Sequence, residues 1–318
     1  MKLFIIKIIF AGVIPLSLVF TISYLWSTNI IEKGSYFSIP NEIHSVILGH
    51  SHSACAFNDS IIDGFYNLSQ NTEGYPYTYF KAQKIIEDNK HVKNIFIEYT
   101  NNQITPWASN RIYGIYLDIN VPRIFPVADK KFILKSFYKS GNISEITNAI
   151  IKSYKSNLEF IISGKRNYLE EFWHNNITPQ HVFSADTSHM PLDFYFKSSE
   201  INFGKNFIDI YSVHRENLIY LFKMKALCKK HKVNLFLIRS PLPQHVSFSN
   251  ESTFINIKET FFSDIAFLDF KDYPMNLCFF ADNQHLNRKG GIEFSHFFND
   301  SIVPNGLIDK SSLLKKAK

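Results

Sequence analysis

The stretch Ser45-Val-Ile-Leu-Gly-His-Ser-His-Ser53 decides the fold of this chain. Its apolar run, Val46 to Leu48, predicts a short buried strand. The strand ends at Gly49 in a polar turn, and a helix is expected to follow. In an open α/β sheet, ligands bind beyond the carboxyl ends of the strands. The Ser51 hydroxyl is therefore expected at a position suited to chemistry.

Strand-like and helix-like segments alternate over most of the rest of the chain. This alternation indicates βαβ units and a parallel sheet covered by helices on both faces. We predict an α/β fold, a three-layer α/β/α sandwich, over residues 44–305. Its strands are expected at 44–49, 65–69, 94–100, 234–239 and 265–270, and its helices at 77–88, 206–231, 251–262 and 288–300.

The segment 103–205, between the third and fourth strands, interrupts the alternation. A structureless loop of about a hundred residues is implausible inside a compact domain. We therefore predict a helical insertion on the rim of the sheet. Its role is either structural or that of a lid or acceptor-binding surface.

The amino terminus predicts a membrane anchor. Residues 8–26 contain no charge and follow Lys2 and Lys7, and about 20 apolar residues span a bilayer. A cleaved signal peptide is the alternative, but its apolar region is shorter and ends at a small-residue cleavage site. We predict a transmembrane anchor at 1–26 and a linker at 27–43. The lysines predict a cytoplasmic amino terminus and an extracytoplasmic body.

Composition excludes several classes of protein. The chain has 318 residues, of which 45% are hydrophobic and 19% charged, as in globular proteins. The net charge of +6 falls partly in a basic tail, 306–318. Without a basic stripe bearing recognition motifs, no nucleic-acid partner is predicted. The three cysteines, Cys55, Cys228 and Cys278, have no CxxC spacing, which argues against a structural zinc site. We expect buried free thiols, with one disulfide as the alternative.

A second polar segment, Phe280 to Asn287, precedes the last predicted helix. It contains Asp282 and His285, whose spacing places both side chains on one side of a tight turn. A serine hydroxyl needs an adjacent base, which a third group holds in position. We therefore predict Ser51 as nucleophile, His285 as base and Asp282 as its orienter. Asn287 is expected to cap the helix that follows.

These segments together resemble a known family. Gly49-His50-Ser51, the polar turn after the second strand, Tyr99-Thr-Asn-Asn102 and Asp282-x-x-His285 resemble the four blocks of SGNH (GDSL-type) hydrolases. The likeness is closest to membrane-anchored members that act on cell-envelope polymers, in the manner of the alginate and teichoic-acid acylation proteins. His50 stands where the family usually has Asp, and the third block keeps only the asparagine of Gly-x-Asn-Asp.

The resemblance implies a flavodoxin-like strand order and the same three catalytic residues. It also implies an oxyanion hole made by the Ser51 backbone N–H, the Asn101 side chain and a donor after the second strand. For that donor Asn71, Thr72 and Gly74 compete. Three residues are further expected to bind substrate: Arg239, His52 and Asn102. A structural salt bridge is the alternative role for Arg239.

The predicted function is that of an extracytoplasmic serine esterase or O-acyltransferase, with acetyl as the expected acyl group. Its substrate would be a cell-envelope or capsular polysaccharide, or another acyl-carrying molecule, and an acyl-donating membrane protein is a further candidate partner. No cofactor or metal is required. Two alternatives remain. One is a metal-dependent hydrolase that uses His50 and His52, with Asp282 and His285 completing the shell. The other is a glycan-binding scaffold on a degenerate hydrolase fold.

Overall fold

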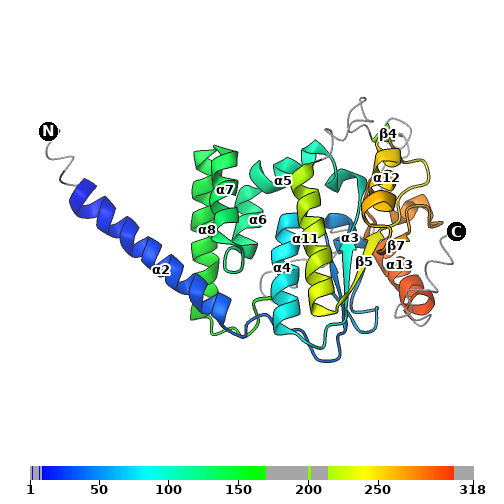
Figure 1. Cartoon of the computed structure of the whole chain (residues 1–318), viewed down its shortest axis with the longest axis horizontal. Helices are drawn as coiled ribbons and strands as arrows, with labels where there is room; N and C mark the ends of the chain where they lie inside the picture. Colours follow the sequence, from blue (N-terminus) through cyan, green and yellow to red (C-terminus); the bar gives the residue numbers. More distant parts are fainter. Residues whose placement is uncertain (1, 3–6, 8, 170–199, 202–213, 304–318) are drawn as a thin grey trace.

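A five-stranded parallel sheet forms the centre of the molecule (Figure 1). The computed structural model describes residues 2, 7, 9–169, 200–201 and 214–303. The strands lie in the order β2-β1-β3-β5-β7, and every neighbouring pair is parallel. The predicted α/β class with a parallel sheet is confirmed. The bounds of the strands are β1 (Ser45–Leu48), β2 (Phe65–Asn67), β3 (Asn94–Glu98), β5 (Asn234–Arg239) and β7 (Ala266–Asp269).

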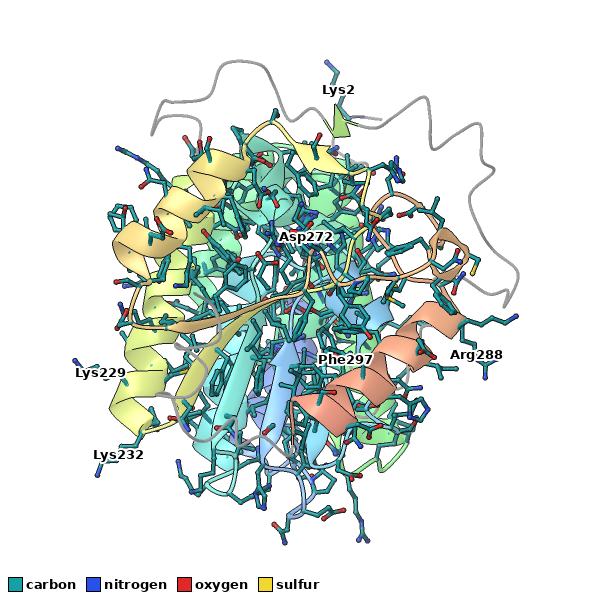
Figure 2. All side chains as sticks on the ribbon, turned by 90° about the vertical axis from the view of Figure 1, so that its right-hand side faces the viewer. Lys2, Lys229, Lys232, Asp272, Arg288 and Phe297 are labelled. Carbon is teal, nitrogen blue, oxygen red and sulfur yellow. The ribbon has the colours of Figure 1, made fainter. Side chains whose placement is uncertain are left out.

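Both faces of the sheet are buried, which explains why its central strands read as continuous apolar runs. Val46 and Leu48 of β1 point into one apolar cluster, and Ile47 points into another. The first cluster includes side chains of α4 (Tyr75–Asp88), α11 (Arg215–His231) and α12 (Glu251–Phe261). The second includes side chains of α3 (Ser51–Ala56) and α13 (Arg288–Ser301). Figure 2 shows α13 crossing the sheet on the side opposite α11.

The predicted elements of the sheet domain are all present, with ends displaced by a few residues. The third strand ends at Glu98 instead of Thr100, and α4 begins at Tyr75 instead of Tyr77. Helix α11 begins at Arg215; the start of the helix predicted at 206–231 lies outside the described residues, as does the tail at 306–318. Cys55 and Cys228 are buried free thiols, as predicted, whereas Cys278 is free but exposed. Cys278 is exposed because it lies in a short surface turn, η6 (Leu277–Phe279).

The segment between β3 and β5 is helical, as predicted, over the part that the structure describes. It contains η2 (Asn101–Gln103), η3 (Pro106–Ala108), α5 (Ser109–Tyr113), α6 (Leu117–Ile124), α7 (Lys130–Ser140) and α8 (Ile143–Ile162). A second small sheet, which the sequence did not predict, joins β4 (Glu200–Ile201) to β6 (Ser247–Phe248). Strands of two residues are too short to show an apolar period.

The amino-terminal helix is the one described helix that is long and apolar enough to cross a membrane, with a mean hydropathy of 1.6 over its best window. It comprises η1 (Ile9–Val13) and α2 (Ile14–Lys33). The helix continues past Trp26, the predicted end of the anchor, through the first part of the predicted linker. Thr28 is buried there and accepts a hydrogen bond from Asn157 Nδ2 of α8 at 3.2 Å. Packing against α8 therefore stabilises the extra turns.

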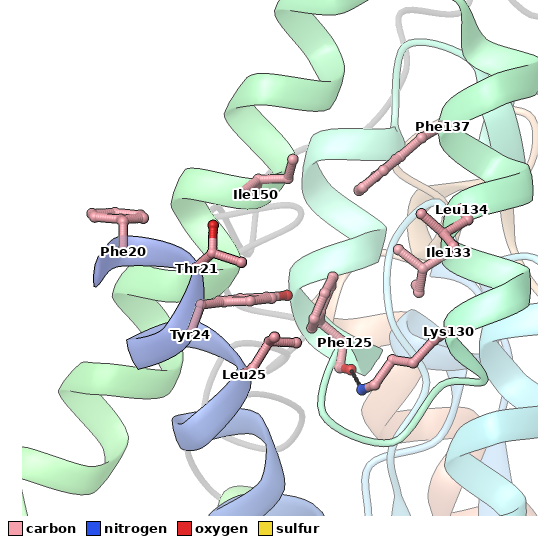
Figure 3. Close-up of a pocket in the computed structure, with 10 residues that line it drawn as sticks. All are labelled: Phe20, Thr21, Tyr24, Leu25, Phe125, Lys130, Ile133, Leu134, Phe137 and Ile150. Carbon is pink, nitrogen blue, oxygen red and sulfur yellow. Dashed lines mark hydrogen bonds between the residues drawn. The ribbon is translucent and has the colours of Figure 1, made fainter. Parts of the chain in front are cut away.

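An apolar cavity of about 330 Å³ is lined by side chains of α2, α7 and α8 (Figure 3). Lys130 Nζ donates to the Phe125 carbonyl at 3.3 Å on its wall. Apolar side chains of α7 and α8 are exposed, among them Leu134, Ile143 and Ile162. The insertion is thus the part of the sheet domain that contacts the candidate membrane-spanning helix.

Candidate active site

The turn that carries Ser51 is organised by a buried carboxylate. Glu98, the last residue of β3, is fully buried, and its Oε2 accepts the backbone N–H groups of His50 at 2.9 Å and Ser53 at 3.0 Å. A Cβ at Gly49 would lie 2.4 Å from the Glu98 Cβ, so only glycine allows this close approach. Glu98 thereby holds Ser51 at the first position of α3, just beyond the carboxyl end of β1.

The loop that carries Asp282 and His285 is a small hairpin held by its own hydrogen bonds. Ala281 N donates to the His285 carbonyl at 2.9 Å, and Asn287 N donates to the Phe279 carbonyl at 2.9 Å. Asp282 Oδ1 accepts the backbone N–H of His285 at 2.9 Å. As predicted, Asn287 caps α13, because its Oδ1 accepts the N–H of Gly290 at 3.0 Å. The positions of both side chains are therefore fixed relative to α13.

Close packing of α13 on α3 brings the two segments together. A Cβ at Gly291 would lie 2.4 Å from the Cys55 carbonyl oxygen, so the helices approach as closely as glycine allows. Ser295 Oγ donates to the Ala56 carbonyl at 3.2 Å and accepts the Asn58 N–H at 2.8 Å. These contacts join residues that are distant in the chain, and they place the His285 hairpin over the start of α3.

Ser51, His285 and Asp282 form a continuous hydrogen-bonded series. Ser51 Oγ lies 2.7 Å from His285 Nε2, and His285 Nδ1 lies 2.8 Å from Asp282 Oδ2. Burial alone would raise the pKa of Asp282, but the His285 ring and backbone N–H groups outweigh it and hold that pKa below its usual value. An ionised Asp282 keeps the proton on Nδ1 and leaves Nε2 free to accept the serine proton. The three groups can therefore activate a hydroxyl for nucleophilic attack.

Two further histidines pack beneath this series. His50 Nε2 lies 2.7 Å from Glu98 Oε1 and 3.0 Å from Thr100 Oγ1. The His52 ring stands edge-on to the His285 ring, with centroids 4.8 Å apart. Burial, followed by nearby cationic groups, lowers the pKa of both His50 and His52, so both rings are neutral at pH 7. His52, predicted to bind substrate, is buried and packs against the His285 ring.

His50 and His52 are also the residues of the alternative prediction, a metal site. Ligand atoms of His50, His52 and Glu98 lie within 4.8 Å of one another, and zinc accepts such a donor set. Glu98 Oε2, however, already accepts two backbone N–H groups. Of the expected additional ligands, His285 is hydrogen-bonded to both Ser51 and Asp282 instead. They do not complete this cluster.

The structure gives the Asn101 side chain partners other than an oxyanion. Its Nδ2 donates to Glu251 Oε2 at 2.9 Å and to Asn250 Oδ1 at 3.2 Å. In this structure, side chains of Asn250 and of Glu251 on α12 therefore occupy the amide that was expected to donate to the oxyanion. The neighbouring Asn102 accepts the Thr100 hydroxyl at 2.8 Å, and that hydroxyl also lies against His50. No described residue accepts from Asn102 Nδ2, which makes Asn102 the asparagine available at the site.

The turn after β2 lies beside the nucleophile turn, since Gln70 N donates to the Gly49 carbonyl at 2.9 Å. Within this turn Thr72 has a φ of +64°, in the left-handed region that favours glycine. Asn71 precedes it, and its backbone N–H has no acceptor among the described residues. Gly74 lies farther along, at the cap of α4, where it packs against Asn217 of α11. Of the three competing donors, Thr72 itself occupies the glycine-like position, and Asn71 is its immediate neighbour.

Arg239 forms salt bridges with acidic side chains of its own domain. Its Nε donates to Asp269 Oδ1 at 2.8 Å, and its Nη1 donates to Glu251 Oε1 at 2.9 Å. The side chain is buried, and its Cζ lies 4.5 Å from the centre of the Phe254 ring. Carboxylates of the chain thus already neutralise the guanidinium that was expected to bind an anionic substrate group. The structural salt bridge, the other reading of the sequence, is the one observed.

One residue of the site, Glu98, was not found from the sequence. It carried a signal, since it is an acidic residue at the end of an apolar strand. A comparison of the sequence with protein-family models and with curated proteins found no match to either. The function therefore has to be inferred from the geometry of the site.

Proposed function

We propose that this chain is an SGNH-type serine esterase or O-acyltransferase that acts on an acylated carbohydrate. The observation that carries this proposal is the 2.7 Å contact between Ser51 Oγ and His285 Nε2. His285 is in turn bound by Asp282. A nucleophile, a base and an orienter in hydrogen-bond reach are the general signature of covalent acyl transfer.

In the first step, Ser51 Oγ attacks the carbonyl carbon of the acyl ester while His285 Nε2 takes the serine proton. Asp282 stabilises the imidazolium that results. The ester C–O bond then breaks, and the departing sugar oxygen takes the proton from His285, which leaves the acyl group on Ser51. In the second step, water or an acceptor hydroxyl attacks this ester and gives its proton to His285 Nε2. The bond between the acyl carbon and Ser51 Oγ then breaks, and His285 returns the proton to Ser51 Oγ.

Negative charge on the carbonyl oxygen needs donors in both steps. We assign this role to the Ser51 backbone N–H, the Asn102 side-chain amide and the backbone N–H groups of the turn at Asn71 and Thr72. Loss of one such donor typically costs about 2.7–4 kcal/mol of transition-state stabilisation. The chemistry uses side chains and backbone alone and requires no cofactor.

The fold and the anchor support the same proposal. Counted along the chain, the sheet strands follow the order 2-1-3-4-5, which is that of flavodoxin-like folds. We infer a three-layer sandwich of the SGNH kind from this order and from the helices on both faces. Lys2 and Lys7 precede the apolar helix, which favours an extracytoplasmic site. There the substrates at hand are envelope or capsular polysaccharides and acyl-donating membrane proteins.

A metal-dependent hydrolase is the second candidate, favoured by the grouping of His50, His52 and Glu98. Metal analysis of the purified chain and the effect of a chelator on turnover separate the two. A serine enzyme keeps its activity in chelator. A metalloenzyme loses it and regains it with the metal. Glycan binding without turnover would instead indicate the scaffold.

The test of the proposal is turnover of p-nitrophenyl acetate by the detergent-purified chain. Ser51→Ala and His285→Ala are expected to abolish both the burst and the steady release of p-nitrophenol. Ser53→Ala is the matched control, because Ser53 lies on the same turn and its buried hydroxyl has no partner among the described residues. Activity near the parent's in Ser51→Ala would refute the proposal.

A further inference from the structure

The apolar cavity of about 330 Å³ has the candidate membrane-spanning helix as one of its walls. Figure 3 shows Tyr24 and Leu25 of α2 on one side of it and Phe125 and Leu134 on the other. Leu134 is 66% exposed, so the cavity opens to the surroundings of the chain. Pockets that bind ligands begin at about 300 Å³, and apolar cavities take up apolar molecules instead of water. The cavity thus has the size, the lining and the access for part of an apolar ligand.

The cavity lies at the depth where the candidate span leaves the bilayer. A hydrocarbon core takes about 20 residues of helix, and counted from Lys7 these end near Trp26. Tyrosine and tryptophan are typical of the boundary between membrane and water, and Tyr24 and Trp26 occupy that boundary here. The residues of α2 that line the cavity come just before it: Phe20, Thr21, Tyr24 and Leu25. Acyl chains of the bilayer can therefore enter the cavity sideways.

Helix α8 runs along α2 toward the membrane. Asn157 contacts Thr28, and nearer the bilayer the Tyr154 ring contacts the Phe20 ring, with centroids 3.9 Å apart. The contacts thus move toward the start of α8 as α2 enters the membrane. At that start Ile143 is 80% exposed. Exposed apolar surface of this kind is typical of contact with a membrane, so the insertion borders lipid as α2 does.

A polar hollow of about 400 Å³ adjoins the apolar cavity, and the two share Lys130. The hollow contains two basic and two acidic side chains, all of them exposed: Lys130, Lys223, Glu32 and Asp129. Glu32 lies about 10 Å farther along α2 than Leu25, which places the hollow at the level of the lipid headgroups. An apolar cavity at the level of the acyl chains thus continues into a charged hollow at the level of the headgroups.

Aromatic rings hold the two ammonium groups of the hollow. Lys130 Nζ lies 5.2 Å from the centre of the Phe125 ring, and Lys223 Nζ lies 4.2 Å from that of Tyr220. Such contacts favour a cation at a fixed place. The hollow therefore offers positive charge at two lysines and negative charge at two carboxylates, and it suits a headgroup that carries both signs.

We propose that a phospholipid with a phosphoethanolamine headgroup binds between α2 and α7, with one acyl chain in the apolar cavity and the headgroup in the polar hollow. The lysines pair with its phosphate, and Glu32 and Asp129 accept N–H groups of its ammonium. A phosphoglycerol headgroup would bring only negative charge to these carboxylates, and a choline headgroup has no N–H to donate.

The headgroup decides which lipid binds. An acyl chain gains little by leaving the bilayer, because the lipid around it is as apolar as the cavity. It does supply the dispersion contacts that an empty cavity lacks. The bound lipid would join α2 to the insertion and so fix the anchor against the sheet domain. This inference is independent of the catalytic proposal, and it depends on α2 crossing the membrane.

The test is photolabelling of the full chain in phosphatidylcholine vesicles that contain a minor fraction of a diazirine-tailed probe lipid. Three probes share the same tail and differ only in the headgroup: ethanolamine, choline and glycerol. Mass spectrometry of the peptides locates the adducts. Bulk lipid labels α2 with every probe, so the α2 adducts serve as the reference. Adducts on residues 130–137 of α7, relative to those on α2, should be about two- to fivefold more frequent with the ethanolamine probe, the range for exposed ion pairs.

Two sets of variants locate the site. Leu134→Glu puts a charge into the cavity at an exposed position and should remove most α7 adducts; Ile219→Glu, at an exposed apolar residue of α11, is the control. Lys130→Gln and Lys223→Gln should each reduce the preference for the ethanolamine probe. Lys131→Gln, at an exposed lysine of α7 that lines neither the cavity nor the hollow, should keep it.

The remaining outcomes would overturn the inference in distinguishable ways. Equal labelling of α7 by all three probes would indicate contact with bulk lipid only. Unchanged labelling in Leu134→Glu would place the adducts outside the cavity. Labelling of α2 without α7 would refute the lipid site and keep the anchor. A chain that no probe labels would refute both.

Discussion

Glu98 offers the sharpest test of how the nucleophile turn is built. The proposed change is Glu98→Gln, which keeps the size of the side chain and removes its charge. In the parent, Oε2 accepts N–H groups of His50 at 2.9 Å and Ser53 at 3.0 Å, and Oε1 lies 2.7 Å from His50 Nε2. A glutamine oxygen can keep the two backbone bonds in neutral form. Its NH2 group would then lie where Oε1 is now, against the His50 ring.

The expected cost follows from these contacts. Hydrogen bonds to a charged group contribute about 1.5–3 kcal/mol each, and neutral ones about 0.5–1.5 kcal/mol. Weakening these two bonds from charged to neutral should lower the free energy of unfolding by about 2–3 kcal/mol, partly offset by removal of a buried charge. A typical domain, with a stability of about 5–15 kcal/mol, remains folded after such a loss.

The assay is urea denaturation of the purified chain, with turnover of p-nitrophenyl acetate measured on the same sample. Glu42→Gln is the matched control, because Glu42 is exposed and should change stability by less than about 0.5 kcal/mol. Turnover in Glu98→Gln should also fall, because the turn that holds Ser51 is less well ordered. A Glu98→Gln chain as stable and as active as the Glu42→Gln chain would refute this account of the turn.

Three further outcomes are expected. Asp282→Asn should leave folding intact and lower kcat by roughly 10⁴-fold, as loss of the orienting carboxylate does in other Ser-His-Asp enzymes; rates within tenfold of the parent would contradict the triad. In Gly291→Ala the new Cβ would meet the Cys55 carbonyl oxygen at 2.4 Å, so the free energy of unfolding should fall by about 1–3 kcal/mol and turnover should slow. An unchanged Tm and an unchanged rate would show that α13 does not set the position of His285. Because burial lowers the pKa of His50 and His52, their neutral forms stabilise the fold above the unfolded-state pKa of about 6.5. Stability should fall by up to about 1.4 kcal/mol per pH unit for each ring as pH drops below that value. Urea denaturation from pH 7.5 to 5 measures this dependence of the free energy of unfolding on pH. An equally steep dependence in His52→Gln would contradict the prediction.

The sheet was predictable because burial on both faces leaves a direct signature. Strands such as 94–98 and 234–239 are runs of apolar residues, and the intervening helices have their own period. The end of α2 was not predictable. Its last turns contain Ser27 and Thr28, which read as a linker, and only contacts with α8 keep them helical.

The site divides in a similar way. The pairing of Ser51 with Asp282 and His285 could be expected, because parallel strands present their carboxyl ends at one edge and the Asp-x-x-His spacing suits a tight turn. The roles of Asn101 and Arg239 could not. Both depend on Glu251, an acidic residue on α12 that binds their side chains across the fold. Tertiary partners of this kind leave no local pattern in the sequence.

Covalent labelling tests the central claim most directly. The intact chain is treated with a fluorophosphonate probe, digested, and the labelled peptide identified by mass spectrometry. Activation of Ser51 by His285 predicts a single adduct on Ser51, absent from Ser51→Ala and strongly reduced in His285→Ala. A chain that stays unlabelled, or that is labelled equally with and without the His285 ring, would contradict the claim.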